Sequence, residues 1–282
     1  MTSSQGDKAG LPTADRSRWY VVVGPGRSGS TILDRLLSAR GVVAVGELVH
    51  LWQRAGVENQ LCACGLAAHD CPFWSAVLHD ALGPSWEREC HRLEQLRQRH
   101  GTYRAWPRMV FRPRSWANDV GALATATAAV VEAIGDRVGP DPVVWDASKS
   151  AIQARLLALA GAAPQIVILT RHPAAVAYSW ARPKARFEAG GRPMPRHGLV
   201  GSSLRWSFAV ISGLAEAYRC RRAALHLDYC DLGAELLVGD RNNTTVEAGA
   251  QAPQPPATAW VHAIGGNPDR WEGTPPRFEV DE

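Results

Sequence analysis

The chain has 282 residues and a formal net charge of +4, and 46% of its residues are hydrophobic. This length and composition suit one globular α/β domain with an ordinary core, while the mild charge argues against a nucleic-acid-binding protein. No run approaches the roughly 18 apolar residues of a membrane helix, and six cysteines are too few for a secreted disulfide scaffold.

Along the chain, short apolar runs alternate with segments of helical periodicity. Residues 1–17 are polar and lack an apolar signal core, which predicts a disordered lead-in to a cytoplasmic protein, and residues 18–282 are expected to form a single domain. Strands are expected at residues 19–23, 42–45, 143–145, 165–170 and 224–227. Helices are expected at residues 32–39, 87–100, 118–138 and 203–222, in a segment that ends at 159, and from 173 onward. This order predicts a three-layer α/β fold, with a mainly parallel central sheet and helices on both faces.

Three segments interrupt the alternation. Residues 50–118 are expected to be irregular apart from one polar helix, and to form an insertion over the sheet that acts as a lid or as a wall of an acceptor pocket. Residues 182–200 are rich in Gly, Pro and Arg, which predicts a mobile loop. Residues 241–258 are rich in Asn, Thr, Gln, Ala and Pro, which predicts a flexible connector.

A glycine-rich turn at residues 24–31 follows the first expected strand and precedes the first expected helix. Successive N–H groups and a helix N-terminus at such a turn favour an anion. The Walker pattern has lysine where this chain has Ser30, so the turn suits one 5′ phosphate better than a triphosphate. We therefore predict a P-loop-like phosphate-binding loop, and a turn without a ligand is the alternative. Its binding residues would be Gly26, Arg27, Ser28, Gly29, Ser30 and Thr31.

Residues 27–31 resemble the 5′-phosphosulfate loop of sulfotransferases that use 3′-phosphoadenosine 5′-phosphosulfate (PAPS), in which a basic residue precedes Ser-Gly-Thr/Ser-Thr. Arg171 and Ser179 follow the strand expected at 165–170, and an arginine at a strand end can bind a phosphate bidentately. In the resembled family an Arg and a Ser at this spacing bind the 3′ phosphate of PAPS. The resemblance thus implies PAPS as cofactor and PAP as product, while an ordinary ion pair of Arg171 is the alternative.

The resemblance also implies catalytic residues. Gly46-Glu47 is similar to the Gly-Glu pair that supplies the base in several sulfotransferases, and Lys149 lies in Asp146-Ala147-Ser148-Lys149, similar to an Asp-Ser-Ser-Lys segment of bacterial members. Sulfuryl transfer needs a base for the acceptor hydroxyl and a cation at the bridging oxygen. We expect catalytic roles for Glu47, Lys149 and Arg27, and an orienting role for Asp146. An ion-paired glutamate and a solvated lysine are the alternatives, and lower-ranked candidate bases are His50, His172, His197 and His262.

Two further segments resemble bacterial sulfotransferases. Cys62-Ala63-Cys64-Gly65 and Cys71-Pro72-Phe73-Trp74 form a compact cluster with His69. Because no Cys-x-x-Cys pair is present, a packing or redox cluster is favoured over a zinc site, and no metal is expected. Residues 265–271 resemble a late Gly-Asn-Pro segment, and in the wider family a late basic residue closes over the 3′ phosphate. This likeness assigns Arg270 to cofactor binding, with a plain surface turn as the alternative.

The sequence therefore predicts a bacterial PAPS-dependent sulfotransferase that modifies a hydroxyl group of a small-molecule acceptor, such as a specialised metabolite, a sugar or a lipid. No nucleic-acid partner and no membrane span are expected, and no oligomeric state is indicated. The chain departs from the family pattern in the Gly-Pro-Gly opening of the loop and in the long connector before Gly265. The alternatives are a nucleotide or small-molecule kinase with a degenerate phosphate loop, and a PAP-binding protein of the same fold without sulfation activity.

Overall fold

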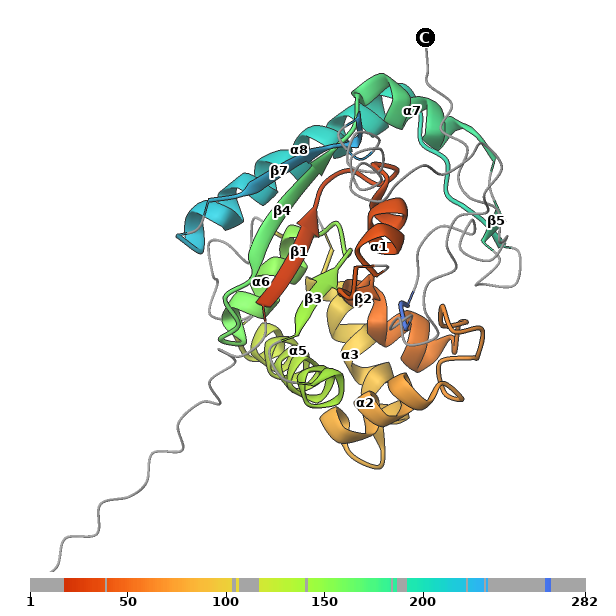
Figure 1. Ribbon diagram of the computed structural model, residues 1–282, viewed down its shortest axis with the longest axis vertical. Helices are drawn as coiled ribbons and strands as arrows, with labels where there is room; N and C mark the ends of the chain where they lie inside the picture. The colour runs from red at the N-terminus through yellow and green to blue at the C-terminus, as the bar shows by residue number, and fades with distance from the viewer. Residues whose placement is uncertain are drawn as a thin grey trace, which may run out of the picture.

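The computed structural model (Figure 1) describes residues 18–38, 40–102, 105–106, 117–139, 142–183, 185–186, 192–221, 223–230, 232 and 262–264. Within them, five strands form a sheet in the order β2-β3-β1-β4-β7, and every neighbouring pair is parallel. The strands are β1 (Arg18–Val23), β2 (Val43–Gly46), β3 (Val143–Asp146), β4 (Gln165–Thr170) and β7 (Leu225–Asp228). The prediction of an α/β fold with a parallel sheet is confirmed. The predicted lead-in at 1–17, the connector at 241–258 and Arg270 lie outside the described residues.

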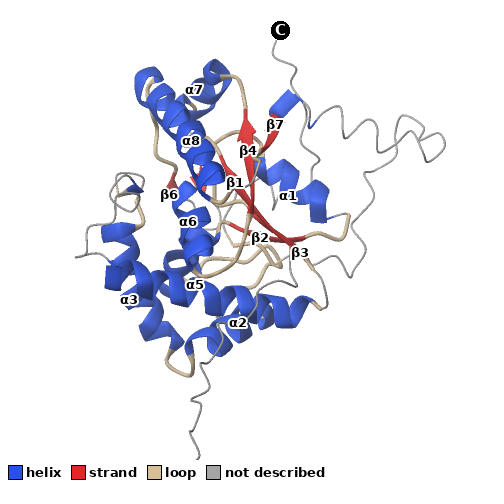
Figure 2. Ribbon diagram, turned by 90° about the vertical axis from the view of Figure 1, so that its left-hand side faces the viewer, coloured by secondary structure: helices blue, strands red, loops and turns tan. Residues whose placement is uncertain are grey.

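Helices cover both faces of the sheet, as the apolar strands require. Along β1, the side chains of Val21 and Val23 enter one hydrophobic cluster and Val22 enters the other, because successive strand residues point to opposite faces. Figure 2 shows α1 (Ser30–Ser38) on one side of the sheet, with α6 (Ala151–Leu159) and α8 (Leu199–Arg219) on the other. The other long helices are α2 (Pro72–Leu82), α3 (Trp86–His100), α5 (Ala117–Val138) and α7 (Pro173–Ala181).

The prediction that residues 50–118 are irregular is wrong for most of the described part of that segment. It contains the π-helix η2 (Trp52–Val57), shortly after the 3-10 helix η1 (Leu48–His50), and the helix α2, which were not expected, while α3 confirms the polar helix expected at 87–100. The apolar side chains of α2 recur at helical spacing and are buried against α5 and α3. Flanking Cys, Pro and Gly residues hide this short period in the sequence. The buried side chains of α2 and α3 therefore belong to the main core, and Figure 1 shows these two helices beside α5.

Residues 182–200 also contain more structure than the predicted loop. β5 (Ala185–Arg186) pairs in the antiparallel sense with β6 (Arg192–Pro193), and α8 begins at Leu199. Among the helices of the described segments, none combines the length and the apolar character that crossing a bilayer requires.

Close backbone packing between β1 and β4 leads to a stability prediction. A Cβ atom on Gly24 would lie 2.2 Å from the carbonyl oxygen of Leu169, so Gly24→Ala forces two adjacent strands apart at the start of the glycine-rich loop. Overpacking of this kind costs roughly 1–3 kcal/mol. The matched control is Gly135→Ala in α5, where the new Cβ meets nothing within 4 Å and helix propensity favours alanine. Denaturant unfolding that finds both variants as stable as the native protein would contradict this packing.

Candidate active site

The candidate residues gather where the carboxyl ends of four neighbouring strands meet. The loop 24–31 follows β1, Glu47 follows β2, Lys149 lies just after β3, and Arg171 follows β4. Because β2, β3, β1 and β4 are adjacent and parallel, these ends share one edge of the sheet. Ligands of open α/β sheets bind outside this edge. The topology therefore brings residues that are far apart in the sequence into one neighbourhood.

The glycine-rich loop is held in a tight conformation. Arg27 and Gly29 have φ angles of +71° and +89°, the Ser28 hydroxyl donates to the Pro25 carbonyl at 2.8 Å, and the Ile32 N–H donates to the Gly29 carbonyl at 3.0 Å. The loop leads directly into α1, so the positive end of the helix dipole faces this edge of the sheet. The loop and the helix N-terminus together form a place where an anion is favoured.

Lys149 joins this loop to the end of β2. Its Nζ donates to Ser30 Oγ at 3.1 Å and forms an ion pair with Glu47 Oε1. The other carboxylate oxygen of Glu47 lies 2.6 Å from Arg54 Nη1. One carboxylate thus lies between two cations, with all three side chains 11–17% exposed. We call Glu47, Lys149 and Arg54 the charged cluster.

The electrostatic environment holds Glu47 in its ionised form. Burial alone would raise the pKa of this carboxyl, but Arg54, Lys149 and His50 outweigh burial and hold the pKa far below the ordinary value of 4.5. Arg54 is a residue of this cluster that the sequence does not predict. It lies on η2, seven residues after Glu47, in a segment whose helical character the sequence hides.

A second, buried carboxyl ties the ends of β2 and β3 together. Asp146 Oδ1 accepts bonds from Ser148 N, at 2.9 Å, from the Ser148 hydroxyl and, at 3.4 Å, from Leu48 N. Ser148 Oγ in turn accepts a bond from Val49 N at 2.9 Å. Burial raises the pKa of Asp146 to about 7, although these hydrogen bonds favour the ionised form. Asp146 thus braces the residues adjacent to Lys149 and to Glu47.

The turn that presents Lys149 is conformationally unusual. Lys149 has a φ angle of +54°, in the left-handed region that residues with a Cβ rarely adopt. Such a conformation persists where surrounding contacts hold it, and it occurs often at functional sites. The contacts of Asp146 with Ser148, and of Lys149 with Ser30 and Glu47, are the bonds that hold this turn.

Arg27 extends to a different part of the edge. Its guanidinium lies over the Trp180 ring, 5.1 Å from the centroid, and donates to Met194 Sδ at 2.9 Å. Trp180 also covers the loop, because a Cβ on Gly26 would lie 2.6 Å from its ring. Lys149, rather than Arg27, is therefore the cation in contact with Ser30. Arg27 stands between the loop and the segment around Met194.

Arg171 packs against a residue that the sequence does not predict for this site. Its guanidinium stacks on the ring of Tyr229, 4.2 Å from the centroid, and its carbonyl accepts a bond from Trp206 Nε1 at 3.0 Å. Tyr229 also packs on the loop, because a Cβ on Gly29 would lie 2.5 Å from its ring. The available signal was position, since Tyr229 directly follows β7. Ser179 is half-buried within α7, the helix that begins two residues after Arg171.

The four histidines that rank as alternative bases have different surroundings. His50 lies in the field of the charged cluster, and loss of hydration together with Arg54 lowers its pKa to about 3. The ring of His172 caps α7, that of His197 packs on Trp180, and that of His262 lies beside cysteines. Among the described residues, His50 is thus the histidine of this set that is electrostatically linked to Glu47.

The cysteine cluster forms around a different histidine from the one that the sequence suggests. Cys62, Cys64 and Cys71 lie together with His262, and their ligand atoms are all within 4.8 Å of one another. His69 instead places Nε2 2.9 Å from the Ala55 carbonyl oxygen and packs edge-on against a tryptophan. The expectation that His69 completes the cluster is wrong, because the partner comes from the far end of the chain.

The lowered pKa of Glu47 leads to a prediction for Glu47→Gln. This change leaves Lys149 and Arg54 close together without the carboxylate, which should cost roughly 3 kcal/mol of stability at neutral pH. The native advantage is full above the ordinary carboxyl pKa of 4.5 and should be lost as the pH falls toward the lowered folded-state pKa. Denaturant unfolding of both proteins at neutral pH and below about pH 4 tests this. A pH-independent difference would contradict the ion pairing.

Comparisons of the chain with protein-family models, with curated proteins and with solved structures found no match. Function is therefore inferred from the geometry of the site. That geometry consists of an anion-favouring loop, a carboxylate between two cations and a stacked arginine, all at one edge of a parallel sheet.

Proposed function

We propose that the protein transfers a sulfuryl group from PAPS to a hydroxyl group of a small-molecule acceptor, with residues 24–31 acting as a P-loop-like phosphate-binding loop. The observation that carries the proposal is the contact of Lys149 Nζ with Ser30 Oγ at 3.1 Å. Ser30 occupies the position where an ATP-binding loop has its lysine. The cation is thus supplied from the end of β3 instead of from the loop.

Two groups of residues support binding of a nucleotide with two separate anionic ends. The loop amides and the N-terminus of α1 suit the 5′ phosphosulfate. Arg171 offers a planar guanidinium for the 3′ phosphate, with Ser179 on the following helix as its companion. Tyr229 lies between the loop and Arg171, so its ring would have to move if a nucleotide bridged these two groups.

The reaction assigned to this site is an in-line displacement at sulfur. The acceptor oxygen forms a bond to sulfur while the bond between sulfur and the 5′ phosphate oxygen breaks, and PAP leaves. The acceptor proton passes to Glu47, and Lys149 stabilises the negative charge that develops on the leaving oxygen. Its contacts with Ser30 and Glu47 use two of the three donors of the ammonium group.

Without a bound donor, Glu47 is a weak base, because both of its carboxylate oxygens face cations. Binding of the phosphosulfate group resolves this difficulty. An anion at the loop draws Lys149 toward the leaving oxygen and weakens its pair with Glu47, which raises the pKa of the carboxyl. Glu47 would then be basic enough to accept the acceptor proton only when the donor is bound. Without a donor, it would not activate the hydroxyl group.

The kinase alternative needs an ionised carboxylate to hold Mg²⁺ near the loop hydroxyl. The two carboxyl groups at the ends of β2 and β3 are poorly suited to that task. Glu47 is engaged by two cations, and Asp146 is buried, bonded to Ser148 and raised in pKa to about 7. A single-phosphate donor without a metal fits this arrangement better.

Nucleotide binding separates the two functions. Calorimetry should detect binding of PAP without a metal, weakened about tenfold or more by Arg171→Ala, because a charge-assisted bidentate contact is lost. The matched control is Arg92→Gln, which removes an exposed arginine paired with Glu89 on α3. Binding of Mg²⁺–ATP with no binding of PAP would overturn the proposal in favour of a kinase.

The chemical roles are tested by transfer from PAPS to a panel of alcohols, phenols and sugars. Glu47→Gln and Lys149→Ala should each lower PAP release at saturating PAPS by about 10²-fold or more, while PAP binding persists. Arg92→Gln again serves as the control. Normal turnover by Glu47→Gln would exclude the base role, and a native protein that binds PAP but modifies no acceptor would support the PAP-binding alternative.

A further inference from the structure

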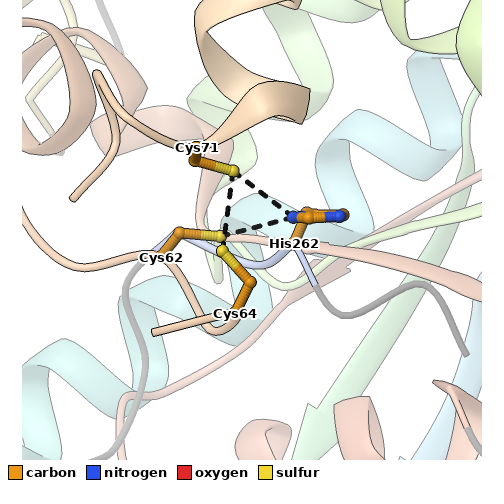
Figure 3. Close-up of side chains that lie close together, drawn as sticks. All are labelled: Cys62, Cys64, Cys71 and His262. Carbon is orange, nitrogen blue, oxygen red and sulfur yellow. Dashed lines mark hydrogen bonds between the residues drawn. The ribbon is translucent and has the colours of Figure 1, made fainter. Parts of the chain in front are cut away.

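A second cluster of chemically reactive side chains lies away from the charged cluster. Figure 3 shows the sulfur atoms of Cys62, Cys64 and Cys71 and the ring of His262 directed toward a common centre. Cys71 Sγ lies 3.7 Å from Cys64 Sγ and 3.3 Å from His262 Nδ1, and Cys62 Sγ lies 3.7 Å from His262 Nδ1. Cys62 and Cys71 are fully buried, and Cys64 is at the surface.

These three of the six distances within the cluster are close to the edges of a zinc-centred tetrahedron. With bonds of about 2.3 Å to sulfur and about 2.0–2.1 Å to nitrogen, tetrahedral zinc places two sulfurs about 3.8 Å apart and a sulfur and a nitrogen about 3.6 Å apart. All four ligand atoms lie within 4.8 Å of one another. Three thiolates and one imidazole form one of the standard ligand sets of a closed structural zinc site.

The backbone forms the cluster from three separate elements. Cys62 and Cys64 lie on a tight turn in which the Gly65 N–H donates to the Cys62 carbonyl at 2.9 Å, and Gly65 has a φ angle of +92°. Cys71 is the N-cap residue of α2, where the helix dipole favours a thiolate. His262 is fixed through its carbonyl, which accepts a bond from Trp74 Nε1 at 2.7 Å, and through stacking of its ring on Phe73.

We propose that Cys62, Cys64, Cys71 and His262 bind one structural zinc ion. A packing role explains two buried thiols, but it does not explain why a surface thiol and an imidazole nitrogen converge on the same point. Soft thiolates with an imidazole in a tetrahedral arrangement select zinc over harder cations. All four protein ligands are present, which leaves no open position for catalysis, so the ion stabilises structure.

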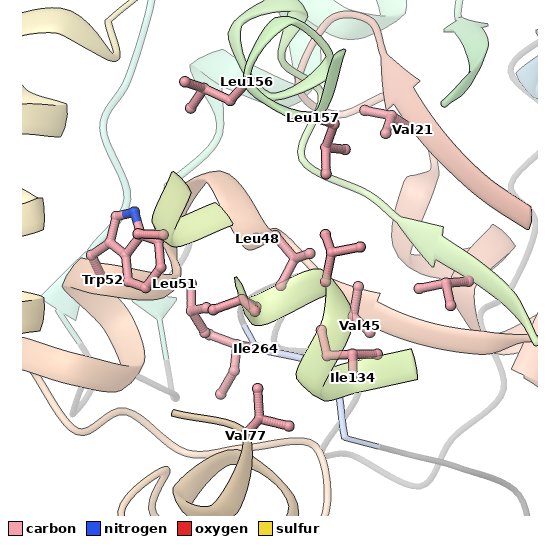
Figure 4. Packing of buried hydrophobic residues seen from close by; sticks show 14 of the residues in the cluster. Val21, Val45, Leu48, Leu51, Trp52, Val77, Ile134, Leu156, Leu157 and Ile264 are labelled. Carbon is pink, nitrogen blue, oxygen red and sulfur yellow. The ribbon is translucent and has the colours of Figure 1, made fainter. Parts of the chain in front are cut away.

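The zinc site would hold residues 262–264 against the end of β2, next to Glu47. Ile264 N donates to the Val45 carbonyl at 3.1 Å, and Glu47 N donates to the Ile264 carbonyl at 2.9 Å. A Cβ on Gly46 would lie 2.4 Å from that same carbonyl oxygen, so glycine is required where the segment passes. The side chain of Ile264 is buried in the core near Val45 (Figure 4).

Zinc would close a very long loop, because Cys62 and His262 are 200 positions apart. Cross-links over long loops restrict the unfolded chain most strongly, and the binding energy of a structural metal contributes directly to folding. The ion would therefore stabilise the contact between residues 262–264 and the backbone of Glu47. This inference holds whether or not the protein transfers sulfuryl groups.

Metal content of the untagged full chain is the primary test. Inductively coupled plasma mass spectrometry should find about one zinc per chain in the native protein. Cys71→Ser and His262→Ala should lose most of this zinc, and His262→Cys should retain it, because four thiolates also bind zinc tetrahedrally. The matched controls are Cys220→Ser and His69→Asn, which lie outside the cluster and should keep a full complement.

Two further measurements on the native protein remain decisive if a variant fails to fold. Cobalt(II) added to chelator-treated protein should give the thiolate charge-transfer and intense visible bands of tetrahedral coordination. Removal of zinc should lower Tm by about 5 °C or more, and added zinc should restore it. Native protein that contains no zinc and does not take it up would overturn the proposal, as would a disulfide among these cysteines under non-reducing mass spectrometry.

Discussion

A carboxylate held between two cations organises the edge of the sheet in this protein. Glu47 has Lys149 on one oxygen and Arg54 on the other, and the three side chains come from the end of β2, the turn after β3 and the π-helix η2. Because each of them is largely removed from water, loss of any one leaves the others under-compensated. The elements that carry them must therefore be positioned together. The brace of Asp146 and Ser148, which links the turns after β2 and β3, serves that requirement.

In the proposed function, the same cluster explains how the loop at residues 24–31 could bind a phosphate without a lysine of its own. Lys149 reaches Ser30 from the neighbouring strand, because β3 lies beside β1 in the sheet. A lysine held by Glu47 is both restrained and partly neutralised until an anion competes for it. In the proposed sulfotransferase this competition couples donor binding to the basicity of Glu47. Lys149 has a left-handed backbone conformation, which is strained for a residue with a Cβ and is held by these contacts.

The cluster of Cys62, Cys64, Cys71 and His262 is connected to the same edge of the sheet through the segment 262–264. The segment 262–264 runs along β2, where it receives a bond from the Glu47 N–H. The proposed zinc ion would secure that segment through His262, while Ile264 anchors it in the core. The glycine at position 46 and the cysteine cluster are then explained by the same segment, residues 262–264. Gly46 leaves room for the passing backbone, and the cysteines hold the segment that passes.

The sequence by itself determined the parallel α/β architecture, because runs such as 19–23 and 165–170 are apolar throughout and alternate with helical periods. It also indicated the residues at the ends of the strands, since Glu47, Lys149 and Arg171 each follow such a run. Only the tertiary structure decided their partners. Arg54 and His262 lack a local signal, and Tyr229 has only its position after a strand, because their roles arise from contacts across the sheet edge and, for His262, across nearly the whole chain. Strand order and burial, which set these contacts and the charges that they stabilise, are properties of the packed molecule.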